Sequence, residues 1–256
     1  MKHYALIGKR LGHSWSERWF EEKFAREGRG DCSYRLKEMA SLDGLRRWVA
    51  DGEISGFNVT TPYKQAIVPL LDNLSPTAQI VGAVNCVMVK NGRLTGFNTD
   101  VPAFEHTLED YLKGHDEQHE RAVVMGSGGA AKAVSFALDV LGIYHILLSR
   151  SGEEPPQGEM RLATGEIYGY SRTMVEAFRP TMVINATPVG MWPDVDSTPW
   201  PWPELLGSDM LVYDLVYNPS PTLLLQQAAA AGASTMDGLA MLHRQAELSW
   251  RLWQWQ

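Results

Sequence analysis

The most informative stretch of the sequence is a run of small residues, Gly126-Ser127-Gly128-Gly129-Ala130-Ala131. It follows an apolar segment, residues 121–125, that predicts a short buried strand, and it precedes a helical pattern over residues 132–141. Glycines let a backbone approach a phosphate closely, and the first turn of a helix offers free N–H groups to an anion. Residues 143–148 supply a second strand, so the run predicts a dinucleotide-binding βαβ unit.

Two charged residues stand at expected helix starts. Thr61 suits the N-cap and Pro62 the first position of a helix over 63–71. This places Lys64 in a first turn, where the positive end of the helix dipole disfavours a cation. Taken alone, Lys64 is explained as a solvent-exposed lysine, and Asp100 as the N-cap of a helix running through Tyr111.

Other polar residues also have structural explanations when each is taken alone. Serines suit turns and caps, asparagines satisfy backbone groups at strand ends, and a lone cysteine behaves as a small buried hydrophobe. The residues concerned are Ser14, Ser16, Asn58, Asn85 and Cys86. His13 and His243 have no partners at metal-ligand spacing, so no metal site is expected.

Composition narrows the class of protein. The chain has 256 residues, with 23 Lys and Arg against 30 Asp and Glu, a net charge of -7. No basic run occurs, which argues against nucleic acid and anionic membrane as partners. Two distant cysteines favour a reducing, cytoplasmic compartment, and no segment approaches the ~18 apolar residues of a membrane span. A globular cytoplasmic enzyme or binding protein that takes a small molecule is expected.

Strands and helices alternate along the chain, which predicts an α/β fold. The first half should contain strands at 4–8 and 55–60, helices at 16–26, 42–50 and 63–71, and a hairpin of 84–89 and 93–98 around Asn91-Gly92. The second half should add strands at 182–185 and 211–215 and a helix at 222–231. A last helix at 238–253 is apolar enough to pack back on the first domain.

The motifs, read together, resemble the shikimate dehydrogenase family. Asn58-Val59-Thr60-Thr61-Pro62-Tyr63-Lys64 matches the family pattern Asn-Val-Thr-x-Pro-x-Lys at every defined position, and residues 12–16 resemble its Ser-x-Ser carboxylate site. Further blocks match in family order: Gly82-Ala83-Val84-Asn85, Gly96-Phe97-Asn98-Thr99-Asp100, the glycine run, Asn185-Ala186-Thr187-Pro188-Val189-Gly190-Met191, Asp214-Leu215-Val216-Tyr217-Asn218-Pro219, and Asp237-Gly238-Leu239-Ala240-Met241-Leu242 through Gln245. Departures are local: Glu17 replaces a common proline, Trp19-Phe20 replaces His-Asn, and Cys86 replaces a common threonine.

The resemblance implies a two-domain enzyme. Residues 1–100 would form an α/β substrate-binding catalytic domain, 101–235 an NADP-binding Rossmann domain, and 236–256 a helical segment returning to the catalytic domain. The implied reaction is the reversible reduction of 3-dehydroshikimate to shikimate, in aromatic amino acid (chorismate) biosynthesis. Lys64 and Asp100 would form the acid–base pair. The implied substrate contacts are Ser14 and Ser16 for the ring carboxylate, and Asn58, Thr60, Asn85, Tyr217 and Gln245 for the hydroxyls.

The implied cofactor is NADP. The implied contacts are Gly126, Ser127, Gly128, Gly129, Ala130, Ser149, Arg150, Ser151, Thr187, Leu215 and Gly238. Where NAD-specific sites carry an acidic residue after the second strand, this chain offers Arg150, a permanently charged donor suited to a 2′-phosphate. Glu153 and Glu154 stand where the family has a second basic residue, so weaker discrimination against NAD is expected.

Two alternatives stay open at this point. A quinate/shikimate dehydrogenase that uses NAD shares nearly all of these motifs. A ligand-sensing protein without turnover could keep the fold, but it would be expected to lose Lys64 or Asp100, and both are present. The chain is expected to be a monomer or a homodimer.

Overall fold

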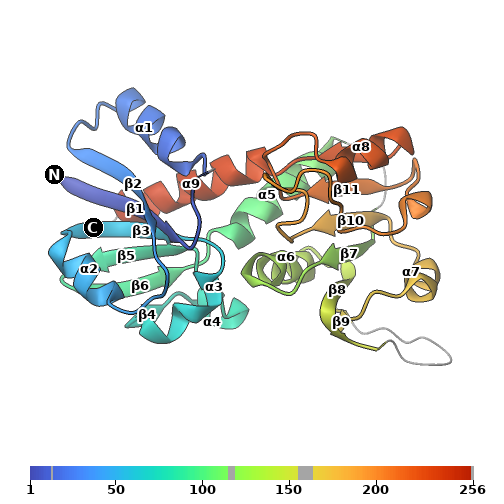
Figure 1. Ribbon diagram of the computed structural model, residues 1–256, viewed down its shortest axis with the longest axis horizontal. Coiled ribbons are helices and arrows are strands. Elements are labelled where there is room, and N and C mark those ends of the chain that lie inside the picture. Colours follow the sequence, from blue (N-terminus) through green and yellow to red (C-terminus); the bar gives the residue numbers. More distant parts are fainter. Residues whose placement is uncertain (13, 115–118, 155–163, 255–256) are drawn as a thin grey trace. The chain divides into compact units, whose positions relative to one another are not determined.

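The computed structural model describes residues 1–12, 14–114, 119–154 and 164–254, so His13 of the serine motif lies outside the described part. Contacts divide the chain into two units, one formed by Met1–Ala103 with Leu242–Gln256 and the other by Phe104–Met241. Each unit is built on its own sheet (Figure 1), and six strands of the described residues form each sheet. No helix in the described ranges is long and apolar enough to cross a membrane.

The sheet of the first unit is mixed. Its strands are β1 (Lys2–Gly8), β2 (Cys32–Glu38), β3 (Ile54–Val59), β4 (Asn73–Leu74), β5 (Cys86–Lys90) and β6 (Arg93–Phe97). They lie in the order β2-β1-β3-β5-β6-β4, and β5 runs antiparallel to both of its neighbours. The expected hairpin between β5 and β6 is confirmed, since Asn91 and Gly92 have φ angles of 52° and 73°, as its two-residue turn requires.

Helices cover both faces of this sheet. They are α1 (Ser16–Arg26), α2 (Leu45–Asp51), α3 (Tyr63–Ala66), α4 (Pro76–Val81) and the larger part of α9 (Leu239–Gln254). On one face, Tyr4 of β1 packs with Phe20 of α1 and Trp253 of α9. On the other face, Ile7 of β1 packs in a cluster with Leu45 of α2. Because side chains alternate along a strand, β1 contributes to both cores.

The second unit has a parallel sheet. Its strands are β7 (Arg121–Met125), β8 (Tyr144–Glu153), β9 (Ile167–Tyr168), β10 (Met182–Asn185), β11 (Leu211–Asp214) and β12 (Ser234–Met236). The order β12-β11-β10-β7-β8-β9 reverses direction at β7, which is the topology of dinucleotide-binding sheets. The helices of this unit are α5 (Asp100–Lys113, from Phe104 onward), α6 (Gly129–Val140), α7 (Arg172–Phe178) and α8 (Leu223–Ala230). The expected α/β class is confirmed.

Two elements differ from their sequence prediction. The helix expected over 63–71 is the short α3 followed by a 3₁₀ turn, η1 (Val68–Leu70), because Pro69 has no N–H to continue an α-helix. The N-cap of α3 is Pro62, without a side-chain cap, so the capping role predicted for Thr61 is wrong. Strand β8 continues to Glu153 instead of ending near residue 148, with irregular pairing to β9 after Leu148.

Candidate functional site

The polar motif residues of the first unit gather at one edge of its sheet. There β1 and β3 end side by side, with Ile7 opposite Val59, and β5 begins, with Cys86 opposite both Asn58 and Phe97. The segments that meet the sheet at this edge carry Ser14, Ser16, Thr60, Lys64, Asn85 and Asp100. The carboxyl ends of the strands of an open α/β sheet are its usual ligand-binding edge, so the topology collects these residues where a substrate would bind.

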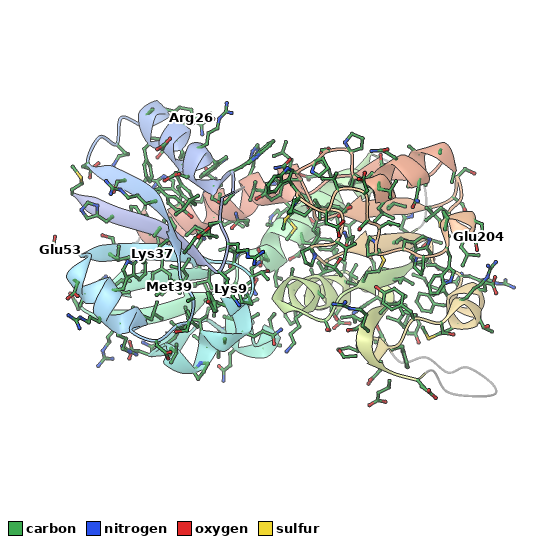
Figure 2. The ribbon with its side chains drawn as sticks, in the orientation of Figure 1. Lys9, Arg26, Lys37, Met39, Glu53 and Glu204 are labelled. Carbon is green, nitrogen blue, oxygen red and sulfur yellow. The ribbon has the colours of Figure 1, made fainter. Side chains whose placement is uncertain are left out.

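The loop after β1 is tied to the loop after β3. Lys9, labelled in Figure 2, donates its backbone N–H to the Thr61 carbonyl at 3.5 Å. Farther along, Ser14 donates its N–H to the Leu11 carbonyl at 2.8 Å, and Ser14 Oγ accepts the N–H of Ser16 at 3.3 Å. The turn role of Ser14 is therefore confirmed, whereas the N-cap of α1 is Trp15, without a side-chain cap. The hydroxyl proton of Ser14 can still be donated to a further acceptor.

Lys64 and Asp100 form an ion pair. Lys64 Nζ lies 2.7 Å from Asp100 Oδ2, and the two side chains are 17% and 6% exposed. The interpretation of Lys64 as a solvent-exposed lysine is therefore wrong. Asp100 does not cap α5 as expected either, because Asn98 Oδ1 accepts the N–H groups of Asp100 and Val101 at 3.0 and 3.1 Å. With Asn98 in that role, the Asp100 carboxylate is turned toward Lys64.

Asn85 donates a hydrogen bond to the second oxygen of the Asp100 carboxylate. Its Nδ2 donates to Asp100 Oδ1 at 2.8 Å and to Thr99 Oγ1 at 2.8 Å, while its Oδ1 accepts the Thr99 N–H at 2.7 Å. Both amide protons are thus used within the protein. Asn85 can meet a substrate hydroxyl only through the remaining lone pair of Oδ1.

Asn58 uses both of its amide protons within the protein. Its Nδ2 donates to the Asn85 carbonyl at 3.1 Å and to Ser249 Oγ of α9 at 2.8 Å, and its Oδ1 accepts from Tyr34 Oη at 2.9 Å. As for Asn85, a substrate hydroxyl can meet Asn58 only through the remaining lone pair of its Oδ1, and the expected substrate contact of Asn58 stays a prediction. Asn58 joins β3 to the Asn85 loop and to α9.

Thr60 and Gln245 complete the set in this unit. Thr60 donates its backbone N–H to the Ile7 carbonyl at 2.9 Å, which fixes it beside the end of β1. Gln245 lies on α9, and its Nε2 donates to the Leu242 carbonyl at 3.0 Å. Tyr217 belongs to the other unit, where it is half-buried on the segment that follows β11.

The glycine run joins β7 to α6 in the second unit. Gly126 has φ 118°, a conformation that favours glycine, and a Cβ there would lie 3.2 Å from the Ala186 carbonyl oxygen. Gly128 is the N-cap of α6, and a Cβ on it would meet nothing within 4 Å. Open space therefore adjoins the first turn of a 12-residue helix, whose N–H groups suit a phosphate. The residues present fit a dinucleotide.

A line of serine hydroxyls runs from the glycine run to the end of β8. Ser127 Oγ lies 3.1 Å from Ser149 Oγ, which lies 3.1 Å from Ser151 Oγ. Between the last two, Arg150 is exposed. This arrangement offers three hydroxyls and one guanidinium, a donor set that suits a phosphate ester.

Asp214 fixes the two loops that follow β10 and β11. Its Oδ1 accepts from Asn185 Nδ2 at 2.8 Å and from the Val216 N–H at 3.0 Å, and its Oδ2 accepts the Thr222 hydroxyl at 2.6 Å. Burial raises the pKa of Asp214 to about 6, against the three hydrogen bonds that favour its charged form. Asn185 Oδ1 in turn accepts the N–H and hydroxyl of Thr187.

Gly238 is required by a close backbone contact. A Cβ at this position would lie 2.0 Å from the carbonyl oxygen of Leu215, a distance that no side chain tolerates. The two residues therefore belong to one tight junction between the segment after β11 and the start of α9. The motifs that contain Leu215 and Gly238 meet here although they are separated in sequence.

Comparison with known proteins agrees with this geometry. A family model described as the shikimate dehydrogenase substrate binding domain matches residues 6–87. The shikimate dehydrogenase (NADP(+)) of Symbiobacterium thermophilum is 38% identical over 259 residues, covering 97% of this chain and 87% of that protein. This chain belongs to the shikimate dehydrogenase family.

Solved structures of this family have the same fold. Shikimate 5-dehydrogenase of Thermus thermophilus, solved with NADP(H) and shikimate, matches with a TM-score of 0.82 and 33% identity over 100% of this chain and 94% of that one. Quinate dehydrogenase of Corynebacterium glutamicum, solved with NAD, matches with a TM-score of 0.82 and 30% identity, again over 100% and 94%. The family therefore accounts for the whole length of the chain.

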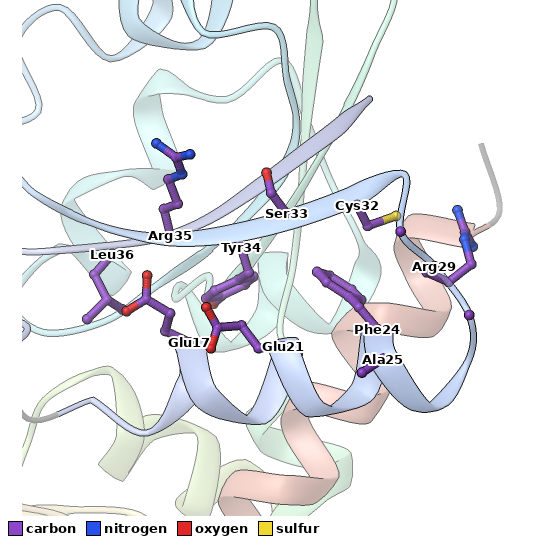
Figure 3. Close-up of a pocket in the computed structure, with 12 residues that line it drawn as sticks. Glu17, Glu21, Phe24, Ala25, Arg29, Cys32, Ser33, Tyr34, Arg35 and Leu36 are labelled. Carbon is purple, nitrogen blue, oxygen red and sulfur yellow. The ribbon is translucent and has the colours of Figure 1, made fainter.

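A separate cavity of about 700 Å³ lies between α1 and β2 (Figure 3). Charged side chains, among them Glu17, Glu21 and Arg35, line it together with the rings of Phe24 and Tyr34. None of the motif residues expected to bind substrate or cofactor belongs to its lining. This cavity is therefore distinct from the sheet edge that carries Lys64 and Asp100.

The candidate lists drawn from the sequence missed four buried polar residues that hold the others in place. They are Asn98, Thr99, Asn185 and Asp214. All four lie inside the motif blocks that carry the family resemblance, so the sequence did contain a signal for them. An asparagine two residues before a helix start also predicts a cap, which is the role of Asn98.

Proposed function

We propose that this chain catalyses the reversible, NADP-dependent reduction of 3-dehydroshikimate to shikimate, with Lys64 and Asp100 as the catalytic pair. The observation that carries the proposal is the 2.7 Å contact between Lys64 Nζ and Asp100 Oδ2 at the ligand-binding edge of the sheet. Asn85 holds the other carboxylate oxygen at 2.8 Å, so the carboxylate is fixed in one orientation. A non-catalytic binding protein would have no need of such a pair.

In the reduction direction, a hydride adds to the C3 carbonyl carbon, and the developing alkoxide needs a proton. The Lys64 ammonium donates that proton, and the Asp100 carboxylate holds the ammonium in place through its Oδ2. The resulting neutral amine regains a proton from water. In the oxidation direction, the neutral amine accepts the C3 hydroxyl proton as the hydride leaves. The net charge of the Lys64–Asp100 pair therefore changes by one unit, through the proton that passes between Lys64 and the substrate.

The substrate carboxylate is assigned to Ser14 and Ser16. Hydroxyl donors bind a carboxylate without the desolvation cost of a buried cation. The ring hydroxyls are assigned to Thr60, Asn85 Oδ1, Gln245 and Tyr217. Asn58 is assigned to the same hydroxyls through the remaining lone pair of its Oδ1, because both of its amide protons are bound within the protein.

The second unit is assigned the dinucleotide, which supplies the hydride when bound. The glycine run and the first turn of α6 would hold the pyrophosphate, and Arg150 with Ser127, Ser149 and Ser151 would hold the 2′-phosphate. Thr187, Leu215 and Gly238 would line the remainder of the cofactor site. The second unit, Phe104–Met241, is thus proposed as the NADP-binding domain, and Met1–Ala103 with Leu242–Gln256 as the catalytic domain with its C-terminal helix, near the bounds of 101–235, 1–100 and 236–256 expected from the sequence.

The compartment proposed is the cytoplasm. Both cysteines, Cys32 and Cys86, are free thiols, as a reducing environment favours. The enzyme is proposed to act as a monomer or a homodimer.

The proposed function is tested by the absorbance of reduced nicotinamide in four assays, shikimate or quinate with NADP or NAD. The highest kcat/KM is expected for shikimate with NADP. Faster oxidation of quinate would assign the chain to the quinate branch of the family. No turnover in any of the four assays would contradict the proposal.

A further inference from the structure

Ser249 of α9 lies at the centre of the buried polar network behind the Lys64–Asp100 pair. Its side chain is fully buried. Ser249 Oγ accepts from Asn58 Nδ2 at 2.8 Å, donates to the Gln245 carbonyl at 2.9 Å, and lies 3.3 Å from Thr99 Oγ1. One hydroxyl therefore joins β3, the segment before α5, and α9, whose Gln245 is assigned to the substrate.

The donors and acceptors in this network are balanced. Ser249 has one proton, which goes to the Gln245 carbonyl, and it uses a lone pair for Asn58. Thr99 Oγ1 accepts from Asn85 Nδ2 at 2.8 Å and can donate its own proton to the same Gln245 carbonyl at 3.2 Å. Two hydroxyls thus converge on one backbone carbonyl of α9. Buried networks in which every member is satisfied specify a single arrangement.

Two series of hydrogen bonds, called paths below, connect Ser249 to the Lys64–Asp100 pair. In the first, Ser249 holds Asn58, whose other amide proton goes to the Asn85 carbonyl at 3.1 Å. In the second, Ser249 and Thr99 donate to the same Gln245 carbonyl, and Thr99 takes the Asn85 side-chain proton that does not go to Asp100. Both paths fix Asn85, and Asn85 fixes the Asp100 carboxylate that holds Lys64.

We propose that Ser249 is a positioning residue of the proposed reaction, which it serves by fixing Asn85 and, through it, the orientation of the Asp100 carboxylate. This inference rests on the proposed function. Ser249 itself touches none of the reacting atoms in this account. Its effect should therefore appear in the chemical step and in the geometry of Asn85.

Ser249→Ala should lower kcat for shikimate oxidation by about tenfold, the loss expected when a supporting hydrogen bond no longer orients a reacting group. The variant leaves a buried proton of Asn58 without an acceptor, so Asn58 and Asn85 lose their fixed positions. The KM for NADP should stay within about twofold, because the glycine run belongs to the other unit.

Trp250→Phe is the matched control on the same helix. Trp250 Nε1 donates to Glu27 Oε2 at 2.7 Å, so this variant also removes one side-chain hydrogen bond of α9, but one unconnected to Asn85. It should lower thermal stability while leaving kcat within about twofold of wild type. A second pair, Thr99→Val and Thr99→Ser, tests the other path, and only the serine variant should keep wild-type kcat.

A readout independent of turnover is the side-chain amide signal of Asn85 in ¹H–¹⁵N NMR spectra. This signal should shift or broaden in Ser249→Ala and stay in place in Trp250→Phe. If Ser249→Ala does not fold, Thr99→Val against Thr99→Ser provides the same comparison.

The outcomes separate the two proposals. A wild type that oxidises shikimate, with Ser249→Ala slowed and its Asn85 signal moved, supports the inference. Equal kcat in Ser249→Ala and Trp250→Phe, or an unmoved Asn85 signal, overturns it. A wild type without shikimate turnover contradicts the proposed function. In that case, the NMR signal of Asn85 alone tests whether Ser249 positions Asn85.

Discussion

The Thr222 hydroxyl donates to Asp214 Oδ2 across 2.6 Å, and this bond joins the end of β11 to the N-cap of α8. Asp214 is completely buried, and it also holds Asn185 at the end of β10. One carboxylate therefore fixes both segments that carry Thr187 and Leu215, two of the proposed cofactor contacts.

This arrangement predicts a pH dependence of stability. Burial raises the pKa of Asp214 from 3.8 to about 6, so between these values the folded protein keeps a proton that the unfolded chain has lost. The free energy of unfolding should therefore fall as pH rises from about 4 to 6, by up to about 3 kcal/mol from this group. Asp214→Asn removes the titration, and its amide nitrogen can donate to Thr222 Oγ1, which reverses the direction of the native hydrogen bond.

Urea denaturation at several pH values between about 4 and 7 measures this effect. Wild type should lose stability relative to Asp214→Asn as pH rises, whereas Asp209→Asn, which changes an exposed carboxylate of the same unit, serves as the control. A constant difference between wild type and Asp214→Asn across this range would show that Asp214 does not titrate as described.

Two glycines should respond differently to alanine. Gly128→Ala adds a methyl group to open space beside the first turn of α6, so the fold should tolerate it, but NADP affinity should fall by at least about tenfold. Gly238→Ala places its Cβ against the Leu215 carbonyl and should destabilise the protein by about 1–3 kcal/mol or more. Thermal melting and NADP titration separate the two effects.

Gly30→Ala serves as the control for this pair, because Gly30 lies in the other unit with no atom within 4 Å of its added Cβ. It should leave both the melting temperature and the NADP affinity unchanged. Unaltered NADP binding in Gly128→Ala would place the pyrophosphate elsewhere.

Arg150 should determine cofactor choice. Arg150→Ala should reduce the ratio of kcat/KM for NADP over NAD by about 10–150-fold, the value of one charged hydrogen bond. Arg172→Ala is the control, because Arg172 is a half-exposed arginine of the same unit that pairs with Glu176 and Glu204, the latter labelled in Figure 2. An unchanged ratio in Arg150→Ala, or a wild type that prefers NAD, would overturn the assignment.

The sequence predicts best the helices and turns whose signal lies in residues that are close together along the chain. The bounds of α1 follow from its apolar face, and Asn91-Gly92 gave the β5–β6 turn. Strand β2 was not predicted, because it lies at the edge of the sheet and carries exposed charges such as Lys37 and Glu38. Helix α3 is shorter than its apolar pattern predicts, because Pro69 lacks the N–H that would continue the α-helix.

The site was predictable as a set of residues but not as a network. Lys64 and Asp100 are 36 positions apart, and no periodicity indicates that they form a pair. The internal partners of Asn58, Tyr34 and Ser249, could not be predicted because they lie 24 and 191 positions away. Once those contacts are known, donor counting leaves Asn58 only one lone pair of Oδ1 for the substrate.

The role of Lys64 in proton transfer is tested by the turnover number of Lys64→Ala for shikimate oxidation with NADP, measured together with the shikimate dissociation constant. Lys37→Ala, an exposed lysine of the same unit labelled in Figure 2, is the control and should match wild type. Loss of the proton donor and acceptor should lower kcat by about 10²–10⁴-fold, while shikimate affinity stays within about tenfold. A fall in kcat of less than about threefold would contradict the role of Lys64 and favour Asp100 as the group that exchanges the proton.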